Sequence, residues 1–296
     1  MIRYQLPPDR QQATAERVVA LLAAASPSDP QDPASRGAYA QLAPHVLATA
    51  PLSESSPAGR RLVLNTTCYL QVYGVSHAGR AVCEQLLDRW RSVLGPDHPD
   101  TLAAASDLTL ALIAVGEAKR VRALGQDTLE RCRRVIGPDR STTLLTATAL
   151  TLALTQLGEA EPARALGQDT LERCRRTLGP DHPTTLTAAT TLTIALGQVG
   201  EAEPARALGQ DTLQRCHQVL GPDHLVTLWA ATALTVTLAQ LGEAEPARAL
   251  GEDTLQHGRR TLGPDHLITR SLARVAVTDP PPLGDDAAED DPSPRR

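Results

Sequence analysis

The chain has 296 residues, of which 42% are hydrophobic, yet it contains no Phe and only 2% aromatic side chains. Its apolar residues are mostly Leu, Ala and Val, which fit closely packed helices and indicate an all-α protein. The net charge of −5 argues against a general nucleic-acid-binding protein, because such a protein needs a positive field to replace the counterions around phosphates.

No segment approaches roughly 18 consecutive apolar residues, and the N-terminus lacks the basic region, apolar core and cleavage site of a signal peptide. We therefore expect a cytoplasmic protein without a membrane partner. Cys132, Cys174 and Cys216 recur at an interval of 42 residues, which is too wide for a zinc knuckle or a redox pair and favours buried, reduced thiols.

The N-terminal flank, residues 1–57, contains two helical patterns, over residues 15–25 and 38–48. A polar, proline-bearing segment separates them. Farther along, the sequence repeats itself. Gly-Pro-Asp recurs every 42 residues at Gly95, Gly137, Gly179, Gly221 and Gly263, and between residues 158–186 and 200–228 the sequence is identical at 23 of 29 positions. A fixed period of this length is typical of a repeat architecture.

Each repeat predicts two helices. In the first, residues such as Leu186, Ala189 and Leu192 follow one another at the three- and four-residue spacing of one helix face. A second glycine series, Gly74, Gly116, Gly158, Gly200 and Gly242, ends each first helix, and proline in the first turn opens most of the second helices. Leu-Gly-Pro-Asp-His then closes the unit, with Asp97, Asp181 and Asp223 as expected caps of the following helices.

A helix pair of this size has two apolar faces and cannot bury both alone, so successive pairs must stack. The fold predicted is an all-α, right-handed α-α superhelical solenoid of antiparallel helix pairs. The array is expected over residues 58–278, as five helix pairs beginning near residue 60 and a capping helix near 268–277. Residues 279–296 are rich in proline and acidic side chains, so we expect a disordered tail.

The repeat unit, with Gly158, Ala163, Leu166, Leu171 and the segment Leu178–Leu186 as one copy, resembles the 42-residue tetratricopeptide repeats of kinesin light chains. It is also similar to the repeats that end bacterial NB-ARC signalling NTPases of the STAND class. The flank resembles the linker of those NTPases in Leu6-Pro7-Pro8-Asp9-Arg10 and in Leu42-Ala43-Pro44-His45. A phosphate-binding loop of the form Gly-x4-Gly-Lys-Ser/Thr is absent from this sequence, whose only lysine is Lys119.

Three features that could suggest chemistry are better explained by the repeat. The Asp-His pairs, such as Asp181-His182, recur about one repeat apart and cannot converge on one metal ion. The segment from Gly74 to Gly79 imitates a nucleophile elbow but has Ala78 in place of its second glycine. Arginines of the second helices could form a basic ridge, but acidic residues precede several of them by four positions, as in Asp127–Arg131, Asp169–Arg173 and Glu172–Arg176.

These considerations predict a protein that is not an enzyme, has no cofactor or metal and binds a protein or peptide. The alternative is the C-terminal sensor region of a STAND NTPase whose ATPase part is missing or encoded separately. The repeat register of the related families implies an inner groove for the partner, with use of the outer face or edge left open. The groove residues implied by this register are Asn65, Asp107, Thr148, Thr190, Thr191, Thr232, Gln156, Gln198, Gln240 and Trp229.

Overall fold

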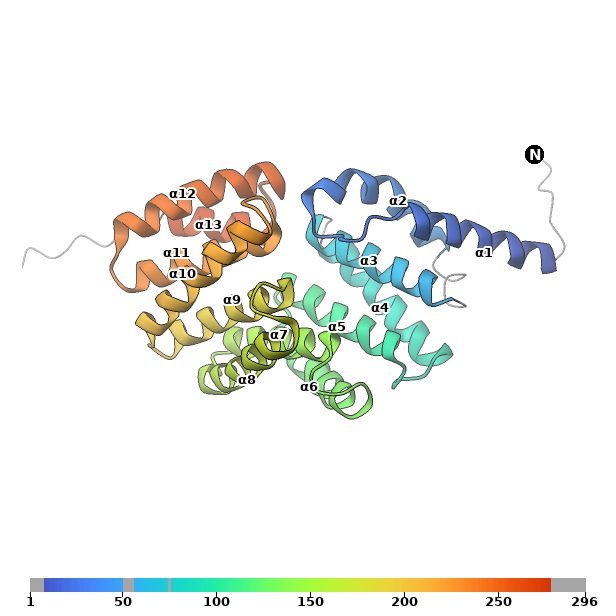
Figure 1. Ribbon diagram of the computed structural model, residues 1–296, viewed down its shortest axis with the longest axis horizontal. Helices are drawn as coiled ribbons and strands as arrows, with labels where there is room; N and C mark the ends of the chain where they lie inside the picture. Colours follow the sequence, from blue (N-terminus) through green and yellow to red (C-terminus); the bar gives the residue numbers. More distant parts are fainter. Residues whose placement is uncertain (1–7, 50–55, 74–75, 278–296) are drawn as a thin grey trace, which may run out of the picture.

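The computed structural model describes residues 8–49, 56–73 and 76–277, and these residues form α-helices and one short 3-10 helix but no strand (Figure 1). The all-α prediction is confirmed. The N-terminal flank contributes α1 (Pro8–Ala25), the 3-10 helix η1 (Pro33–Ser35) and α2 (Arg36–Thr49). The predicted disordered tail, residues 279–296, and the glycine at position 74 lie outside the described residues.

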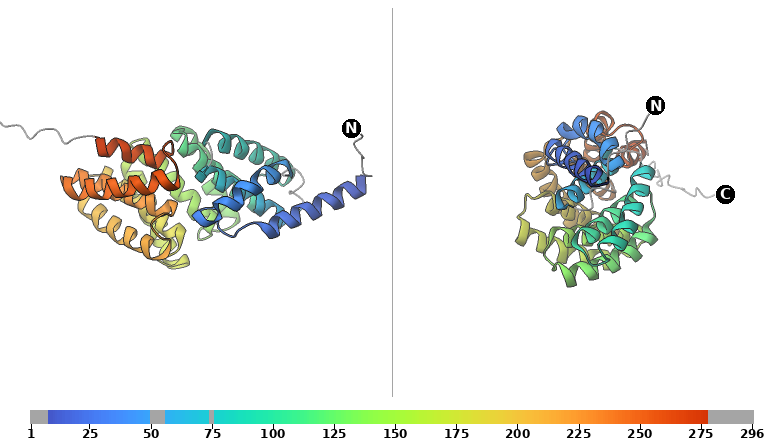
Figure 2. Two further views of the ribbon diagram at one scale, coloured as in Figure 1. Left: turned by 90° about the horizontal axis from the view of Figure 1, so that it is seen from above. Right: turned by 90° about the vertical axis from the view of Figure 1, so that its right-hand side faces the viewer.

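Ten helices then pack as five antiparallel pairs, in which each helix contacts the next one along the chain. They are α3 (Pro57–Tyr73) with α4 (Ser76–Val93), α5 (Pro99–Ala114) with α6 (Ala118–Val135), α7 (Ser141–Gln156) with α8 (Ala160–Leu178), α9 (Pro183–Gln198) with α10 (Ala202–Val219), and α11 (Leu225–Gln240) with α12 (Ala244–Thr261). A last helix, α13 (Leu267–Val277), packs on α12. The pairs curve around a common axis, so that the chain has a rounded outline in end view (Figure 2).

The two glycine series end the helices as predicted. Gly158 (φ 76°) follows α7 and Gly179 (φ 89°) follows α8, and the equivalent glycines of the other described repeats also have positive φ. Only glycine adopts this conformation without strain.

The residue that caps the first helices was predicted wrongly. The Nδ1 atom of His98, His182 and His224, and not the preceding aspartate, accepts a hydrogen bond from the backbone N–H two residues later, at 3.1 to 3.2 Å. In each case the histidine is the extended residue just before the helix, which is the N-cap position. The aspartate lies one residue too early for this role.

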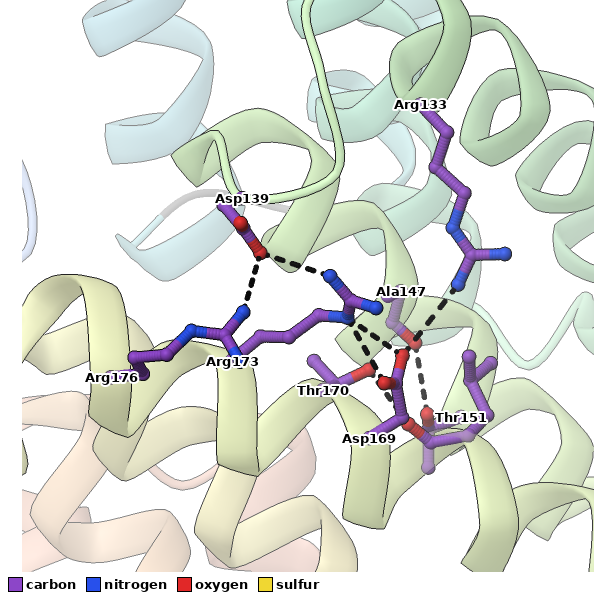
Figure 3. A network of polar contacts seen from close by, with 9 residues as sticks. Arg133, Asp139, Ala147, Thr151, Asp169, Thr170, Arg173 and Arg176 are labelled. Atoms are coloured by element: carbon purple, nitrogen blue, oxygen red, sulfur yellow. Dashed lines mark hydrogen bonds and ion pairs between the residues drawn. The ribbon is translucent and has the colours of Figure 1, made fainter.

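Asp97, Asp181 and Asp223 instead bind the second helix of the next repeat, as does the equivalent Asp139. Asp139, in the loop between α6 and α7, accepts hydrogen bonds from Arg173 at 3.0 Å and Arg176 at 3.3 Å, both on α8 (Figure 3). Arg173 also contacts Asp169 of its own helix at 3.0 Å. Arg131 and Arg215 make the same double contact in their repeats, whereas the predicted partner of Arg176, Glu172, is not the one it uses. These exposed ion pairs are individually weak but fix each loop to its neighbour.

Threonine dominates the polar part of the core. Thr151, Thr193 and Thr235 are at most 1% exposed and occupy equivalent positions of α7, α9 and α11. Each hydroxyl donates to the backbone carbonyl four residues earlier, at 2.8 to 3.0 Å. A buried hydroxyl is costly only when it lacks a partner, so threonine can line the contact between helices here at little cost.

Glycines within the second helices bring those helices close to the threonine layer. A Cβ atom added at Gly167 of α8 would lie 3.2 Å from the Thr151 methyl group and 3.1 Å from a methyl group of Leu192 on α9. Gly209 has the same surroundings one repeat later. At Gly125 of α6, by contrast, the nearest atoms belong to Leu150 at 3.6 Å, which is an ordinary contact.

These distances predict opposite effects for two equivalent substitutions. Gly125→Ala gains helix propensity of up to about 1 kcal/mol without a clash, whereas Gly167→Ala forces buried side chains apart. Urea unfolding should therefore show Gly167→Ala to be at least about 1 kcal/mol less stable than Gly125→Ala. Equal stabilisation by both alanines would contradict the close packing of α8 on α7 and α9.

Candidate functional site

The first helices of the repeats form the inner layer of the array. In Figure 1, α5, α7 and α9 lie on the inner side of the curve, and α6 and α8 lie outside them. The central first helices pack against the first helices of both neighbouring repeats and against two second helices; α9, for example, contacts α7, α11, α8 and α10. The face of α9 that these four helices leave uncovered points to the inside of the curve.

The four threonines predicted to face a partner lie inside this packing. Thr148, Thr190, Thr191 and Thr232 are all buried, and each hydroxyl donates to a carbonyl of its own helix, at 2.7 to 3.0 Å. In this conformation they are not available to a partner. The repeat register alone did not show that these four side chains are buried.

The three glutamines do reach the surface. Gln156, Gln198 and Gln240 are exposed and form the last residue of α7, α9 and α11. The Gln240 side chain leans toward the preceding repeat: a Cβ atom added at Gly197 of α9 would lie 2.8 Å from its Oε1 atom. The Gln240 amide thus covers the backbone of α9 at Gly197.

An aliphatic residue lies one helical turn before each glutamine, and it was missed by the sequence analysis. Leu152 and Ile194 are partly exposed, and Val236 is 37% exposed. Each is four residues before its glutamine and therefore on the same helix face. The signal in the sequence was the 42-residue interval between these three positions. We call these six residues the inner row, with Leu152, Ile194 and Val236 as its aliphatic part and Gln156, Gln198 and Gln240 as its amide part.

The inner row lies on helices without ionisable side chains. None of the residues of α7, α9 and α11 is Asp, Glu, Lys, Arg or His. The second helices, α8, α10 and α12, carry all the charges of these three repeats apart from those in the connecting loops. The inner row therefore offers methyl groups and neutral amides, and it has no charge with which to attract or repel a ligand.

The two N-terminal members of the predicted site have other partners. Asn65 of α3 hydrogen-bonds with Tyr39 of the flank. Asp107 of α5 is half-buried, accepts a hydrogen bond from Thr67 at 3.3 Å and lies near the thiols of Cys68 and Cys83. Burial raises the pKa of Asp107 to about 7.

The cysteines show no arrangement suited to chemistry. Cys132, Cys174 and Cys216 are fully buried, and burial raises their pKa to about 11 in the first two and about 12 in the third. A thiol that is hard to deprotonate is a poor nucleophile and a poor metal ligand. In the part of the chain that the structure describes, no three His, Cys, Asp or Glu side chains come together as a metal site would require.

Trp229, the predicted aromatic anchor, is only partly exposed. It packs against an apolar cluster that contains Leu228, Leu255 and Leu272 at the C-terminal end of the array. The cluster also contains Val72 of α3, so Trp229 packs against a cluster that joins the two ends of the array.

Among the described helices, none is long and apolar enough to span a bilayer.

The raised pKa of Asp107 predicts a destabilising charge at high pH. Because its pKa is about 7 in the folded chain and 3.8 ordinarily, the folded state retains a proton that the unfolded state releases. Stability from this group is thus lost as the pH rises from about 4 to about 7. Asp107→Asn should raise the melting temperature, and by more at about pH 8 than at about pH 5. The exposed Asp88→Asn serves as control; an equal gain at both pH values would contradict the assignment.

Comparisons with known proteins give a consistent result for the fold. Solved structures that resemble the chain include a variant of a putative kinesin light chain with nearly identical TPR-like repeats from Podosopora anserina (TM-score 0.51, 20% identity, 68% of this chain and 95% of that one). Another is BtubC (BKLC) from P. vanneervenii (TM-score 0.52, 14% identity, 98% of this chain and 100% of that one).

A third is a Rap protein complexed with competence and sporulation factor, with a TM-score of 0.50, 12% identity, and coverage of 80% of this chain and 68% of that one. At these identities the likeness concerns the fold alone. Comparison with curated proteins gives no significant match. A sequence profile described as tetratricopeptide repeat matches residues 69–100, 101–140, 143–184, 185–225 and 227–267. These matches span more than half of the chain, which therefore belongs to the tetratricopeptide repeat family.

Proposed function

We propose that the chain is a non-enzymatic scaffold that binds an extended, mainly uncharged segment of a partner protein along the inner row. Tetratricopeptide repeats typically mediate protein–protein interaction. The observation that carries the proposal is the absence of ionisable side chains from α7, α9 and α11, next to partly exposed aliphatic side chains that recur once per repeat.

The chemistry of the inner row suits such a segment. A glutamine amide offers two donors and an acceptor, so a row of amides can meet the N–H and C=O groups of an extended backbone in any sequence. The aliphatic residue one turn earlier in each of these three helices offers apolar contact to the part of the ligand that lies beside it. A charged ligand would lose its hydration on this surface without finding an opposite charge.

The outer face is the rival surface, and many of its charges already take part in ion pairs between repeats. Arg173, Arg176 and Arg215 are paired with aspartates of their own or the preceding repeat. A second series joins the outer helices at their other ends, where Arg122 contacts Glu159 and Arg206 contacts Glu243 at 3.1 Å. A partner that bound these arginines would first have to break contacts that hold adjacent repeats together.

A selection with random linear peptides tests the surface before any natural partner is identified. The enriched peptides should be apolar, with few charged residues, and Val236→Glu should abolish their binding because it places a carboxylate in the inner row. The matched control is Val219→Glu. This valine is 49% exposed, against 37% for Val236, but it lies on the second helix α10. Both variants must keep the helical circular dichroism of the wild type.

The salt dependence of the same complex gives an independent answer. Binding through methyl groups and amides should change little between low salt and about 0.5 M salt, because no ion pair is screened. Enrichment of acidic peptides, loss of affinity with salt, and a greater effect of Val219→Glu than of Val236→Glu would together assign binding to the outer face.

We further propose, from the sequence resemblance alone, that the protein acts in cytoplasmic signalling in a bacterium. In the alternative form of this proposal, the chain is the sensor region of a STAND NTPase regulator. An NTPase chain with a phosphate-binding loop that co-purifies with this protein would support the alternative. If exhaustive purification from the native host yields partners without any such NTPase, the independent scaffold is the better description.

A further inference from the structure

The two ends of the repeat array touch each other. Val72, in the last turn of α3, is 4% exposed. It belongs to one apolar cluster with residues that follow it by four repeats, and Cys68 and Tyr73 of α3 pack against the same cluster. The partners at the C-terminal end are Leu225, Leu228, Trp229, Leu255, Leu262, Ile268, Leu272 and Ala273, from α11 to α13. In Figure 1 these two groups of helices face each other across the upper half of the molecule.

An arginine of the flank joins the same contact. The guanidinium of Arg36, at the start of α2, donates a hydrogen bond of 2.7 Å to the backbone carbonyl of Thr261, the last residue of α12. Its Cζ atom lies 5.2 Å from the centroid of the Tyr73 ring. The carbonyls at a helix C-terminus lack partners within the helix and carry partial negative charge, so they favour a cation.

The flank is itself fixed to α3 and moves with it. The Tyr73 hydroxyl donates to the carbonyl of Gln31 at 3.0 Å, and the Tyr39 hydroxyl donates to that of Pro27 at 2.8 Å. The Tyr39 and Tyr69 rings stack with centroids 5.5 Å apart. Residues 26–39 and 68–73, which we call the clasp, therefore form one unit that lies against α11, α12 and α13.

The first turn of α11 lies beside the clasp as well. His224 is 4% exposed, and the carboxylates of Asp29 and Asp32 are close enough to act on its imidazole. The clasp thus reaches the start of α11, the end of α12 and the side of α13. Trp229 lies on the second turn of α11 and packs against the apolar cluster to which Val72 belongs.

The contact at the clasp is smaller than the contacts between repeats. Adjacent repeats share whole helix faces, close contacts such as that of Gly167 with Leu192, and ion pairs such as that of Arg173 with Asp139. The clasp is held by side chains of one apolar cluster together with the contacts of Arg36. When the array flexes, the clasp should therefore separate before any pair of repeats does.

We propose that the clasp is a reversible intramolecular lock, which closes the array end to end over Trp229 and opens without unfolding of the repeats. In the closed state Trp229 and the adjoining end of the inner face are withheld from a partner, and in the open state they become accessible. The consequence for partner access rests on the proposed function, whereas the opening itself does not. Opening of the clasp can be measured on the protein without a partner, so this proposal and the proposed function can each be refuted without the other.

Pulsed electron paramagnetic resonance measures the opening directly. Spin labels are attached to cysteines introduced at Ala40 on α2 and Gln256 on α12, which are both exposed. The unsubstituted chain is the labelling control, since its cysteines are buried or, like Cys68, have a pKa raised by burial to about 12. The labelled protein with no further substitution should give one narrow distribution of distances between the two spin labels. Arg36→Glu should add a population at longer distance, with an opening constant raised by about tenfold, as expected when a hydrogen bond to a charged donor is lost.

The two native tryptophans give a second readout. Trp90 is fully buried in α4, so an increase in acrylamide quenching on opening reports Trp229. Arg175→Glu is the matched control, because Arg175 is an exposed arginine of the outer helix α8. The proposal is overturned if the wild type already shows a broad, long distribution, if Arg36→Glu changes neither readout, or if Arg175→Glu changes both to the same extent. An unchanged melting transition of the repeats in Arg36→Glu is also required, because a chain that opens only by unfolding has no lock.

Discussion

The close packing of second helices on the buried threonines of first helices is the constraint on which the other features depend. A helix pair cannot bury both of its apolar faces alone, so each pair must pack on the next. Thr151, Thr193 and Thr235 can line this packing because each hydroxyl is satisfied by its own helix. Their small size allows the helices to approach, and the glycines of the second helices, such as Gly167, allow the outer layer to follow.

The distribution of charge follows from the same packing. Helices packed this closely cannot bury an ionised side chain between them at low cost. The helices α7, α9 and α11 have no ionisable side chain. Asp107, on the first helix α5, has a pKa raised by burial to about 7. In the repeats from α7 to α12 the charges of the helices lie on the outer ones, where they connect adjacent repeats through contacts such as Arg173 with Asp139. What remains on the inner face is a row of aliphatic and amide groups.

The period of the repeat and the ends of its helices could be predicted because they depend on short-range rules. A glycine with positive φ ends a helix wherever it occurs, and Gly158 and Gly179 do so here. The orientation of Thr148 and Thr190 could not be predicted in the same way. The sequence shows that they occupy equivalent positions of their helices, but whether these positions meet a neighbouring helix or a partner depends on the angle between repeats. The helix caps were missed because the extended histidine and the aspartate before it both carry acceptors.

The contact between Arg36 and Thr261 was beyond prediction for a further reason. It joins residues separated by 225 positions, and it exists only because the accumulated curvature of the repeats returns the chain to its start. A small change of angle in each repeat would separate the two ends. In the proposed lock, curvature would therefore control access to the inner face, because opening at the clasp depends on the geometry of the whole array.

The central claim is that partners bind the inner row, and isoleucine methyl NMR tests it most directly. Ile194 belongs to the inner row, whereas Ile136 is the C-cap of the outer helix α6. The protein is labelled at its isoleucine methyl groups, and a peptide enriched in the random-peptide selection is added. The Ile194 signal should shift, and the Ile136 signal should stay in place. A shift of Ile136 with Ile194 unchanged would contradict the account, because it would place the partner on the outer helices.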